Sequence, residues 1–328
     1  MLKKALMTAA AAAAIGVPGL TPTQQALAAE AEPAPPYTLT GNVGVFSQYI
    51  FRGLSQTNRD PAIQGGFDFA HESGFYLGTW ASNISWLREN STINAGGAPF
   101  VMGSYSGGGS MEWDFYGGYK WGFAEDWTLD VGTLYYWYPG TTNQIISAAN
   151  NAVGLPSVPR ANTWEIYAAL SWKWLSAKYS YSVDNKTFGV LDSTGTWYLD
   201  LSANAPLGEW VGLPGLNLQL HWGWQKYSGT DARNAYFSSA FVGGPAPYPT
   251  TPSNDELYSY KDVKIGLTYT LPKDFVIGAF WSQAYDYNKL GYGSYNDLVY
   301  TSGGANYYGP FPKDIGKSTG TVFIQKTF

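Results

Sequence analysis

Apolar and polar side chains alternate with a period of two along most of the chain, which is the pattern of β-strands whose two faces meet different surroundings. In residues 164–174, Trp164 and Ile166 share one face and Glu165 the other. Residues 127–138 and 216–225 repeat this pattern. Weaker copies lie at 38–51, 61–71, 74–86, 110–121, 176–184, 195–204, 261–271, 274–286 and 317–328. We therefore expect about twelve strands, each long enough to cross a bilayer when tilted.

The connections between these strands alternate in length. Short turns are expected at 71–74, 123–126, 175–177 and 271–274, with a somewhat longer one at 205–215. Long connections are expected at 52–60, 87–109, 139–161, 184–194, 228–260 and 287–316. Outer-membrane barrels have short periplasmic turns and long outer loops. The sequence therefore predicts an all-β fold, a transmembrane antiparallel up-and-down β-barrel with both chain ends on the periplasmic side.

The composition supports a wall that faces lipid. Aromatic residues make up 17 % of the chain and charged residues 13 %, whereas a soluble domain carries about 25 % charged residues. A mean hydropathy of −0.19 excludes a protein with many membrane-spanning helices. The chain has no cysteine, which excludes disulfides, thiol catalysis and cysteine-ligated zinc. Trp and Tyr near the strand ends are typical of the aromatic girdles at the two membrane interfaces.

The amino-terminal residues have the pattern of a secretory signal peptide. Lys3 and Lys4 precede an apolar stretch, and small residues at Ala26 and Ala28 form a cleavage pattern. We expect a signal peptide at residues 1–28, a disordered stub at 29–36 rich in Pro and Ala, and the barrel at 37–328. An exported β-barrel of this kind is expected in the outer membrane of a Gram-negative bacterium.

If the apolar faces meet lipid, the alternate faces line the interior. The residues expected to line a pore are Asp68, Glu112, Asp114, Tyr116, Lys120, Asp130, Tyr136, Glu165, Tyr167, Lys173, Asp200, His221 and Lys264. With Asp262 and Lys178, the inward set holds seven carboxylates and four lysines. An excess of carboxylates favours cations in a narrow path, which predicts a mild preference for cations.

Other chemistries find little support in the sequence. The two histidines do not suit a serine hydrolase at the lipid boundary, because His71 falls in a predicted turn and His221 in mid-strand on the inward face. No enzyme activity, cofactor or metal site is therefore expected, although residues 253–256 carry oxygen ligands of the kind calcium takes. The absence of a basic run argues against a nucleic-acid partner.

Several segments resemble the TorF-type porin family of Gram-negative outer-membrane β-barrels. The resemblance is carried by residues 41–44, 47–56, 61–68, 74–84, 112–119, 135–140 and 165–167. It implies an outer-membrane barrel with a pore role and brings no catalytic residues. The terminal Phe328, with Ile324 and Val322 on its face, is similar to the signal read by the barrel-assembly machinery, and Lys326 departs from that pattern.

These observations predict a porin that passes small hydrophilic solutes by passive diffusion through a narrow pore. Two alternatives stay open: a substrate-selective channel of sugar or nucleoside type, and a plugged barrel with a structural or adhesive role at the surface. In the selective channel, inward Tyr116, Tyr136, Tyr167 and Tyr198 would form the solute path. The expected partners are outer-membrane lipid, lipopolysaccharide, the assembly machinery and small solutes. An oligomer is compatible with the sequence.

Overall fold

The computed structural model describes residues 35–89, 93–95, 98–100, 109–140, 159–239, 246–302 and 305–328. The expected signal peptide at 1–28 lies outside the described residues, as does the expected stub up to residue 34.

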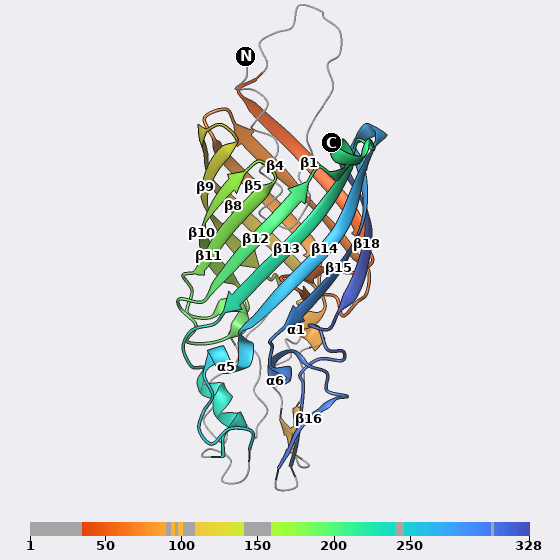
Figure 1. The fold of residues 1–328 in the computed structure, drawn as a ribbon. Helices are drawn as coiled ribbons and strands as arrows, with labels where there is room; N and C mark the ends of the chain where they lie inside the picture. The colour runs from red at the N-terminus through yellow and green to blue at the C-terminus, as the bar shows by residue number, and fades with distance from the viewer. Residues whose placement is uncertain are drawn as a thin grey trace, which may run out of the picture.

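Twelve antiparallel strands form a closed barrel (Figure 1), which confirms the predicted fold class. Each strand pairs with its neighbours in chain order, and the first strand pairs with the last. The strands are β1 (Tyr37–Phe46), β4 (Ala62–His71), β5 (Phe75–Asn83), β8 (Met111–Ala124), β9 (Trp127–Trp137), β10 (Thr163–Trp172), β11 (Leu175–Ser182), β12 (Trp197–Ala205), β13 (Leu216–Lys226), β14 (Tyr260–Leu271), β15 (Phe275–Tyr285) and β18 (Thr319–Thr327).

The pairing of β1 with β18 closes the barrel. Its register runs from Asn42 opposite Thr327 to Phe46 opposite Phe323. Just beyond β18, the backbone of Phe328 exchanges two hydrogen bonds with Gly41. A Cβ atom at Gly41 would lie 2.6 Å from the Phe328 ring, so a larger residue there would displace that ring.

The outer wall of the barrel is apolar and exposed, whereas the alternate residues are buried. On β4, Ile63 is 65 % exposed and its neighbours Ala62 and Gln64 are buried at 0 % and 7 %. Val322 on β18 is 60 % exposed, and Thr321 beside it is buried. Side chains of successive residues in a strand point to opposite faces, so one apolar set covers the outside of the whole sheet. A large exposed apolar surface of this kind marks a membrane or protein interaction surface.

The helices of the protein are short. Among the described residues, none is both long and apolar enough to span a membrane.

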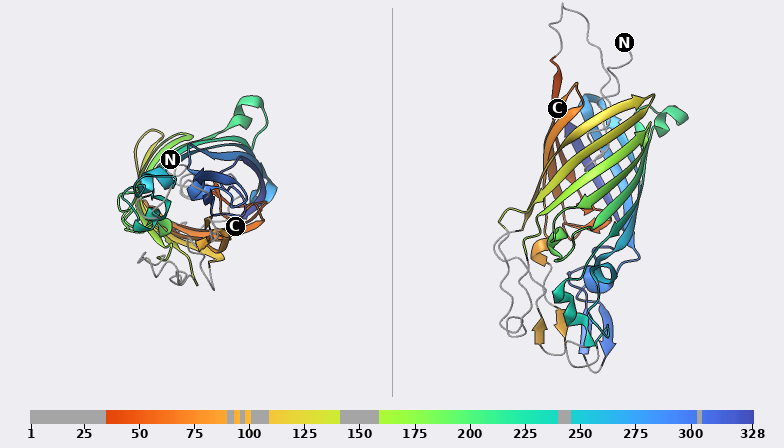
Figure 2. Two further views of the ribbon diagram at one scale, coloured as in Figure 1. Left: turned by 90° about the horizontal axis from the view of Figure 1, so that it is seen from below. Right: turned by 90° about the vertical axis from the view of Figure 1, so that its left-hand side faces the viewer.

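The short connections, the start of β1 and the end of β18 lie at one end of the barrel, and the described parts of the longer connections lie at the other (Figure 1). We call these the turn end and the loop end. One predicted turn is shifted, because β11 already begins at Leu175 and the turn falls on Lys173 and Trp174. The connection between β12 and β13 contains α3 (Leu207–Val211), which projects sideways from the barrel in Figure 2.

The long connections carry small elements of their own. They are β2 (Ile50–Phe51), β3 (Leu54–Ser55), α1 (Trp86–Glu89), β6 (Ile93–Ala95), β7 (Ala98–Phe100), η3 (Thr187–Gly189), η4 (Ala232–Phe237), α5 (Asn254–Tyr258), α6 (Lys289–Tyr292), β16 (Leu298–Ser302) and β17 (Ala305–Tyr308), whereas η5 (Pro272–Asp274) forms a turn. Residues 253–256, considered above for calcium, form the capping box of α5, in which Glu256 accepts hydrogen bonds from Ser253.

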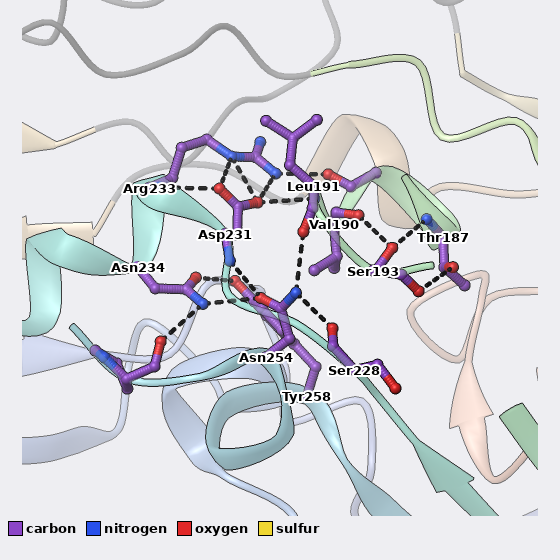
Figure 3. A network of polar contacts seen from close by, with 12 residues as sticks. Thr187, Val190, Leu191, Ser193, Ser228, Asp231, Arg233, Asn234, Asn254 and Tyr258 are labelled. Atoms are coloured by element: carbon purple, nitrogen blue, oxygen red, sulfur yellow. Dashed lines mark hydrogen bonds and ion pairs between the residues drawn. The ribbon is translucent and has the colours of Figure 1, made fainter. Parts of the chain in front are cut away.

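A buried polar network ties two of the long connections together at the loop end (Figure 3). Asn254 donates hydrogen bonds of 2.9 Å to the carbonyl groups of Leu191 and Ser228. Its side-chain oxygen accepts from the backbone of Asp231 at 2.9 Å and from Asn234 at 3.0 Å. All four hydrogen bonds are made by the buried side chain of Asn254, so these connections are held together without a covalent link.

Candidate functional site

The lumen is crossed by the hairpin of β2 and β3, which leads from β1 to β4. Arg52 and Gly53 form its tip, with φ angles of 46° and 78°. Two successive left-handed residues are the geometry of a tight type I′ hairpin turn. A Cβ atom at Gly53 would lie 2.4 Å from Cβ of Asp262 on β14, so the tip touches the far side of the lumen and needs glycine there.

Arg52 fixes this tip to the opposite wall. Its guanidinium binds Glu165 of β10 in bidentate fashion, with Nη2 2.7 Å from Oε2 and Nη1 3.0 Å from Oε1. Nη1 also donates to Gln225 of β13 at 2.8 Å. The Arg52 and Glu165 side chains are only 8 % and 3 % exposed, so this ion pair is buried. A bidentate pair fixes orientation as well as position.

Aromatic rings enclose the same guanidinium. Its central carbon lies 4.2 Å from the centre of the Tyr198 ring, 4.8 Å from that of Phe51 and 5.9 Å from that of Phe188. Contacts of this kind between a cation and a ring face are attractive, and they are strengthened where water is absent. The hairpin tip therefore narrows the lumen with the Arg52–Glu165 ion pair and the aromatic side chains around it.

Two further carboxylates lie on β8 near the segment that leads into the hairpin. Glu112 Oε1 accepts a hydrogen bond of 2.6 Å from the hydroxyl of Tyr49. Burial and the Glu112 carboxylate raise the pKa of Tyr49, so its hydroxyl stays protonated and donates. Asp114, two residues along the same face, has an Oδ1 atom with no hydrogen-bond partner in the described structure.

Toward the turn end, tyrosines and lysines on β5, β8, β10 and β11 face carboxylates on β4 and β9. Tyr116 donates to Asp68 at 2.6 Å, and Tyr76 donates to Asp130 at 2.7 Å. The Tyr76 hydroxyl also shares a hydrogen bond with that of Tyr167. The ammonium nitrogen of Lys120 lies 4.6 Å from the Tyr76 ring centre, and that of Lys178 lies 3.9 Å from the Tyr167 ring centre.

A histidine bridges two carboxylates on the adjoining wall. His221 Nε2 lies 2.8 Å from Asp262 Oδ1, and its Nδ1 lies 3.4 Å from Asp200 Oδ1. The Tyr198 hydroxyl is 2.9 Å from His221 Nε2. Within the described ranges, no group of three or more His, Cys, Asp or Glu residues could hold a metal ion.

Twelve of the thirteen residues expected to line a pore lie in the barrel strands on the buried or half-buried face. They are Asp68, Glu112, Asp114, Tyr116, Lys120, Asp130, Tyr136, Glu165, Tyr167, Asp200, His221 and Lys264. The role of these residues in lining a pore stays a prediction. Tyr136 and Glu165 meet at Arg52, whereas Asp68 and Tyr116 lie together nearer the turn end.

Lys173 was expected on the inner face, and this prediction is wrong. β10 ends at Trp172, and Lys173 lies in the following turn with a φ of 52°. Its side chain is 51 % exposed and its ammonium nitrogen is 3.7 Å from Asp126, in the neighbouring turn. The strand ends at Trp172, before the end of the alternating segment 164–174. The alternation therefore assigns no face to Lys173.

The sequence interpretation missed Arg52, which hydrogen-bonds to Glu165, Gln225 and Tyr136 across the lumen. It lies in a predicted long connection, and nothing in the alternation of strands shows that a connection folds inward. The available signal was local: Arg52 is followed by glycine and flanked by Phe51 and Leu54, so a single charge lies in an apolar turn.

Comparison with known proteins gives a family and a set of distant structures. Residues 30–243 match the profile of a family described as "Bacterial protein of unknown function (Gcw_chp)". No curated protein sequence matches the chain.

Three of the similar solved structures are outer-membrane proteins or porins. The KdgM porin is 8 % identical with a TM-score of 0.41, the match covering 88 % of this chain and 99 % of that one. The NanC porin is 10 % identical with a TM-score of 0.41, covering 88 % and 98 %. The outer membrane protein OprD from Pseudomonas aeruginosa is 12 % identical with a TM-score of 0.33, covering 88 % and 65 %.

Proposed function

We propose that this chain, which belongs to the Gcw_chp family of bacterial proteins of unknown function, is an outer-membrane porin for small hydrophilic solutes. The observation that carries the proposal is the contrast between the two faces of one closed sheet. The outer face exposes apolar side chains such as Ile63 and Val322, and the inner face carries charged and hydroxyl groups. Closure satisfies the backbone hydrogen bonds, which lipid cannot do.

The membrane placement follows from the same contrast. An exposed wall of this kind suits hydrocarbon, and the expected signal peptide supports export. The resemblance to the TorF-type porins also supports a pore role. We place the turn end in the periplasm and the loop end outside, with lipid and lipopolysaccharide around the wall. Assembly then uses the terminal Phe328 as the signal for the barrel-assembly machinery.

A mild preference for cations is part of the proposal. The inner faces of the described strands carry seven carboxylates (Asp68, Glu112, Asp114, Asp130, Glu165, Asp200 and Asp262). They meet four lysine or arginine side chains, namely Lys120, Lys178, Lys264 and Arg52 of the hairpin, and His221, which lies between Asp200 and Asp262. Lys173, which the sequence analysis counted among the inner-face lysines, is left out because it lies in a turn, and Arg52 is counted in addition. The excess of negative charge supports faster passage of cations through a narrow path.

A planar bilayer experiment tests the proposal. The purified full chain, inserted into a bilayer, should give discrete conductance steps in potassium chloride. In a salt gradient, the reversal potential should have the sign of a cation-preferring pore. Flux in liposome swelling should fall smoothly as solute size increases. A complete absence of conductance would contradict the porin function, and a reversal potential of opposite sign would contradict the cation preference.

A barrel plugged at the loop end is the second candidate, favoured by the hairpin that crosses the lumen. Buried apolar clusters surround the hairpin, one including Leu54 and Leu257 and the other Tyr49 and Trp80. In this case the barrel carries ordered outer connections as a structural or adhesive surface. The same recording separates the two candidates, because a plugged barrel gives no conductance.

A further inference from the structure

Two carboxylates on β8 lack a cation. Glu112 and Asp114 share the inner face of the strand, and each is 1 % exposed. In the described part of the chain, neither forms an ion pair, and Oδ1 of Asp114 has no hydrogen-bond partner. Burial of an ionised carboxylate without a partner is strongly unfavourable, so this pair of carboxyl groups either stays protonated or takes up a cation.

The chain itself does not supply that group. Arg52 is the basic residue at this level of the lumen, and its two terminal nitrogens are bound to Glu165. Three carboxylates thus face one guanidinium. The internal segments outside the described residues, 90–92, 96–97, 101–108, 141–158, 240–245 and 303–304, contain no Lys, Arg or His. A cation that enters the lumen would supply the balancing charge.

The surroundings of Asp114 select the kind of cation. Its cross-strand neighbours are Trp80 on β5 and Tyr136 on β9, both buried. The Tyr49 ring packs edge-on against Trp80 with centres 5.3 Å apart. Aromatic groups beside a carboxylate suit an ammonium or guanidinium group, which gains from both the charge and the ring faces. Calcium takes six to eight oxygen ligands, and among the described residues no group of three or more His, Cys, Asp or Glu could hold a metal ion.

We propose that Glu112 and Asp114 form a binding site for the ammonium or guanidinium group of an organic cation that enters the lumen. The cationic group hydrogen-bonds to the unpartnered Oδ1 of Asp114, while Tyr49 keeps its hydrogen bond to Glu112. The proposal rests on the porin function, because the solute reaches the inner face of β8 through the lumen. Organic cations are then the class of solute that the constriction favours.

Calorimetry and bilayer recording on the full chain test the site. The cationic ligand is 1,4-diaminobutane at neutral pH, and its matched neutral control is 1,4-butanediol. The variants Asp114→Asn and Glu112→Gln remove one charge each and keep the side-chain shape. Asp68→Asn is the matched control, since Asp68 is an inner-face carboxylate near the turn end that already accepts a hydrogen bond from Tyr116. Heat-modifiable migration in gels verifies that each variant is folded.

We expect saturable binding of the diamine, reduced at least tenfold by Asp114→Asn and by Glu112→Gln and less than twofold by Asp68→Asn. Butanediol should give no saturable heat. Absence of diamine binding to the unmodified chain, equal binding by all variants, or saturation by calcium alone would overturn the proposal. A conducting barrel that does not bind the diamine would contradict the site and leave the porin function intact. Diamine binding without conductance would contradict the porin function and retain the site.

Discussion

Arg52 Nη2 lies 2.7 Å from Glu165 Oε2, so a buried ion pair joins the tip of the β2–β3 hairpin to the wall on the far side of the lumen. The ion pair holds the β2–β3 hairpin, which is part of a connecting segment, across the lumen of the barrel. The width of the path at this level then depends on whether the hairpin stays attached.

Replacement of Arg52 should release the hairpin. Arg52→Ala leaves the Glu165 carboxylate buried without a counter-charge, which costs about 3–5 kcal/mol in similar cases. We expect a higher single-channel conductance and a lower denaturant midpoint. The double variant Arg52→Ala with Glu165→Gln should keep the high conductance and recover part of the stability. Arg88→Ala, at an exposed position of α1, is the control. Unchanged conductance in Arg52→Ala would show that the hairpin does not restrict the path.

Ion selectivity should respond to lysines according to their face. Lys178 lies on the inner face of β11 against Tyr167, whereas Lys173 is exposed in a turn beside Asp126. Lys178→Gln removes a positive charge from the lumen and should shift the reversal potential further toward cation preference. Lys173→Gln should leave it unchanged, because the charge faces solvent and is screened. Equal shifts in the two variants would contradict the assignment of faces.

Loss of the Asn254 amide should loosen the outer connections. Asn254→Ala leaves the Leu191 and Ser228 carbonyls and the Asp231 amide without their partner, and each unpaired buried group costs about 1–3 kcal/mol. We expect faster cleavage of these connections by proteinase K at the cell surface, with the barrel itself still resistant. Asn296→Ala removes a single exposed hydrogen bond and should leave the cleavage rate close to that of the unmodified protein.

Phe328 should matter for assembly more than for the final fold. Its ring is 64 % exposed, so truncation to Ala removes little buried surface. If the assembly machinery reads this residue, Phe328→Ala should lower the amount of folded, heat-modifiable protein in outer membranes several-fold. Thr327→Ala, which keeps the terminal ring, serves as the control. Normal levels of folded Phe328→Ala protein would argue against the assembly signal.

The wall of the barrel could be predicted from the sequence because each of its signals is local. Alternation assigns a face to a residue from its immediate neighbours, as it did for Ile166, which is exposed, and Glu165, which is buried. Connection lengths then separate the turn end from the loop end. The same local rule failed at Lys173, where the alternation runs past the end of β10 into a turn.

The constriction could not be predicted because its contacts are distant in the chain. Arg52 binds Glu165 and Gln225, which are 113 and 173 residues away. No periodicity within a strand specifies which connection folds into the lumen or which wall it reaches. The excess of inner-face carboxylates could be counted from the sequence, but the unpartnered oxygen of Asp114 is visible only once the cross-strand neighbours are known.

The closed strand order has a consequence for the order of assembly. Eleven of the twelve strand pairs join elements that follow one another along the barrel, so each can form as a hairpin beside the previous one. The pair β1–β18 instead joins residues such as Asn42 and Thr327, which are far apart in the sequence. Until β1 pairs with β18, the sheet has two open edges that can pair with other chains. Pairing of β1 with β18 is therefore the step that removes both open edges and leaves the sheet without an exposed strand.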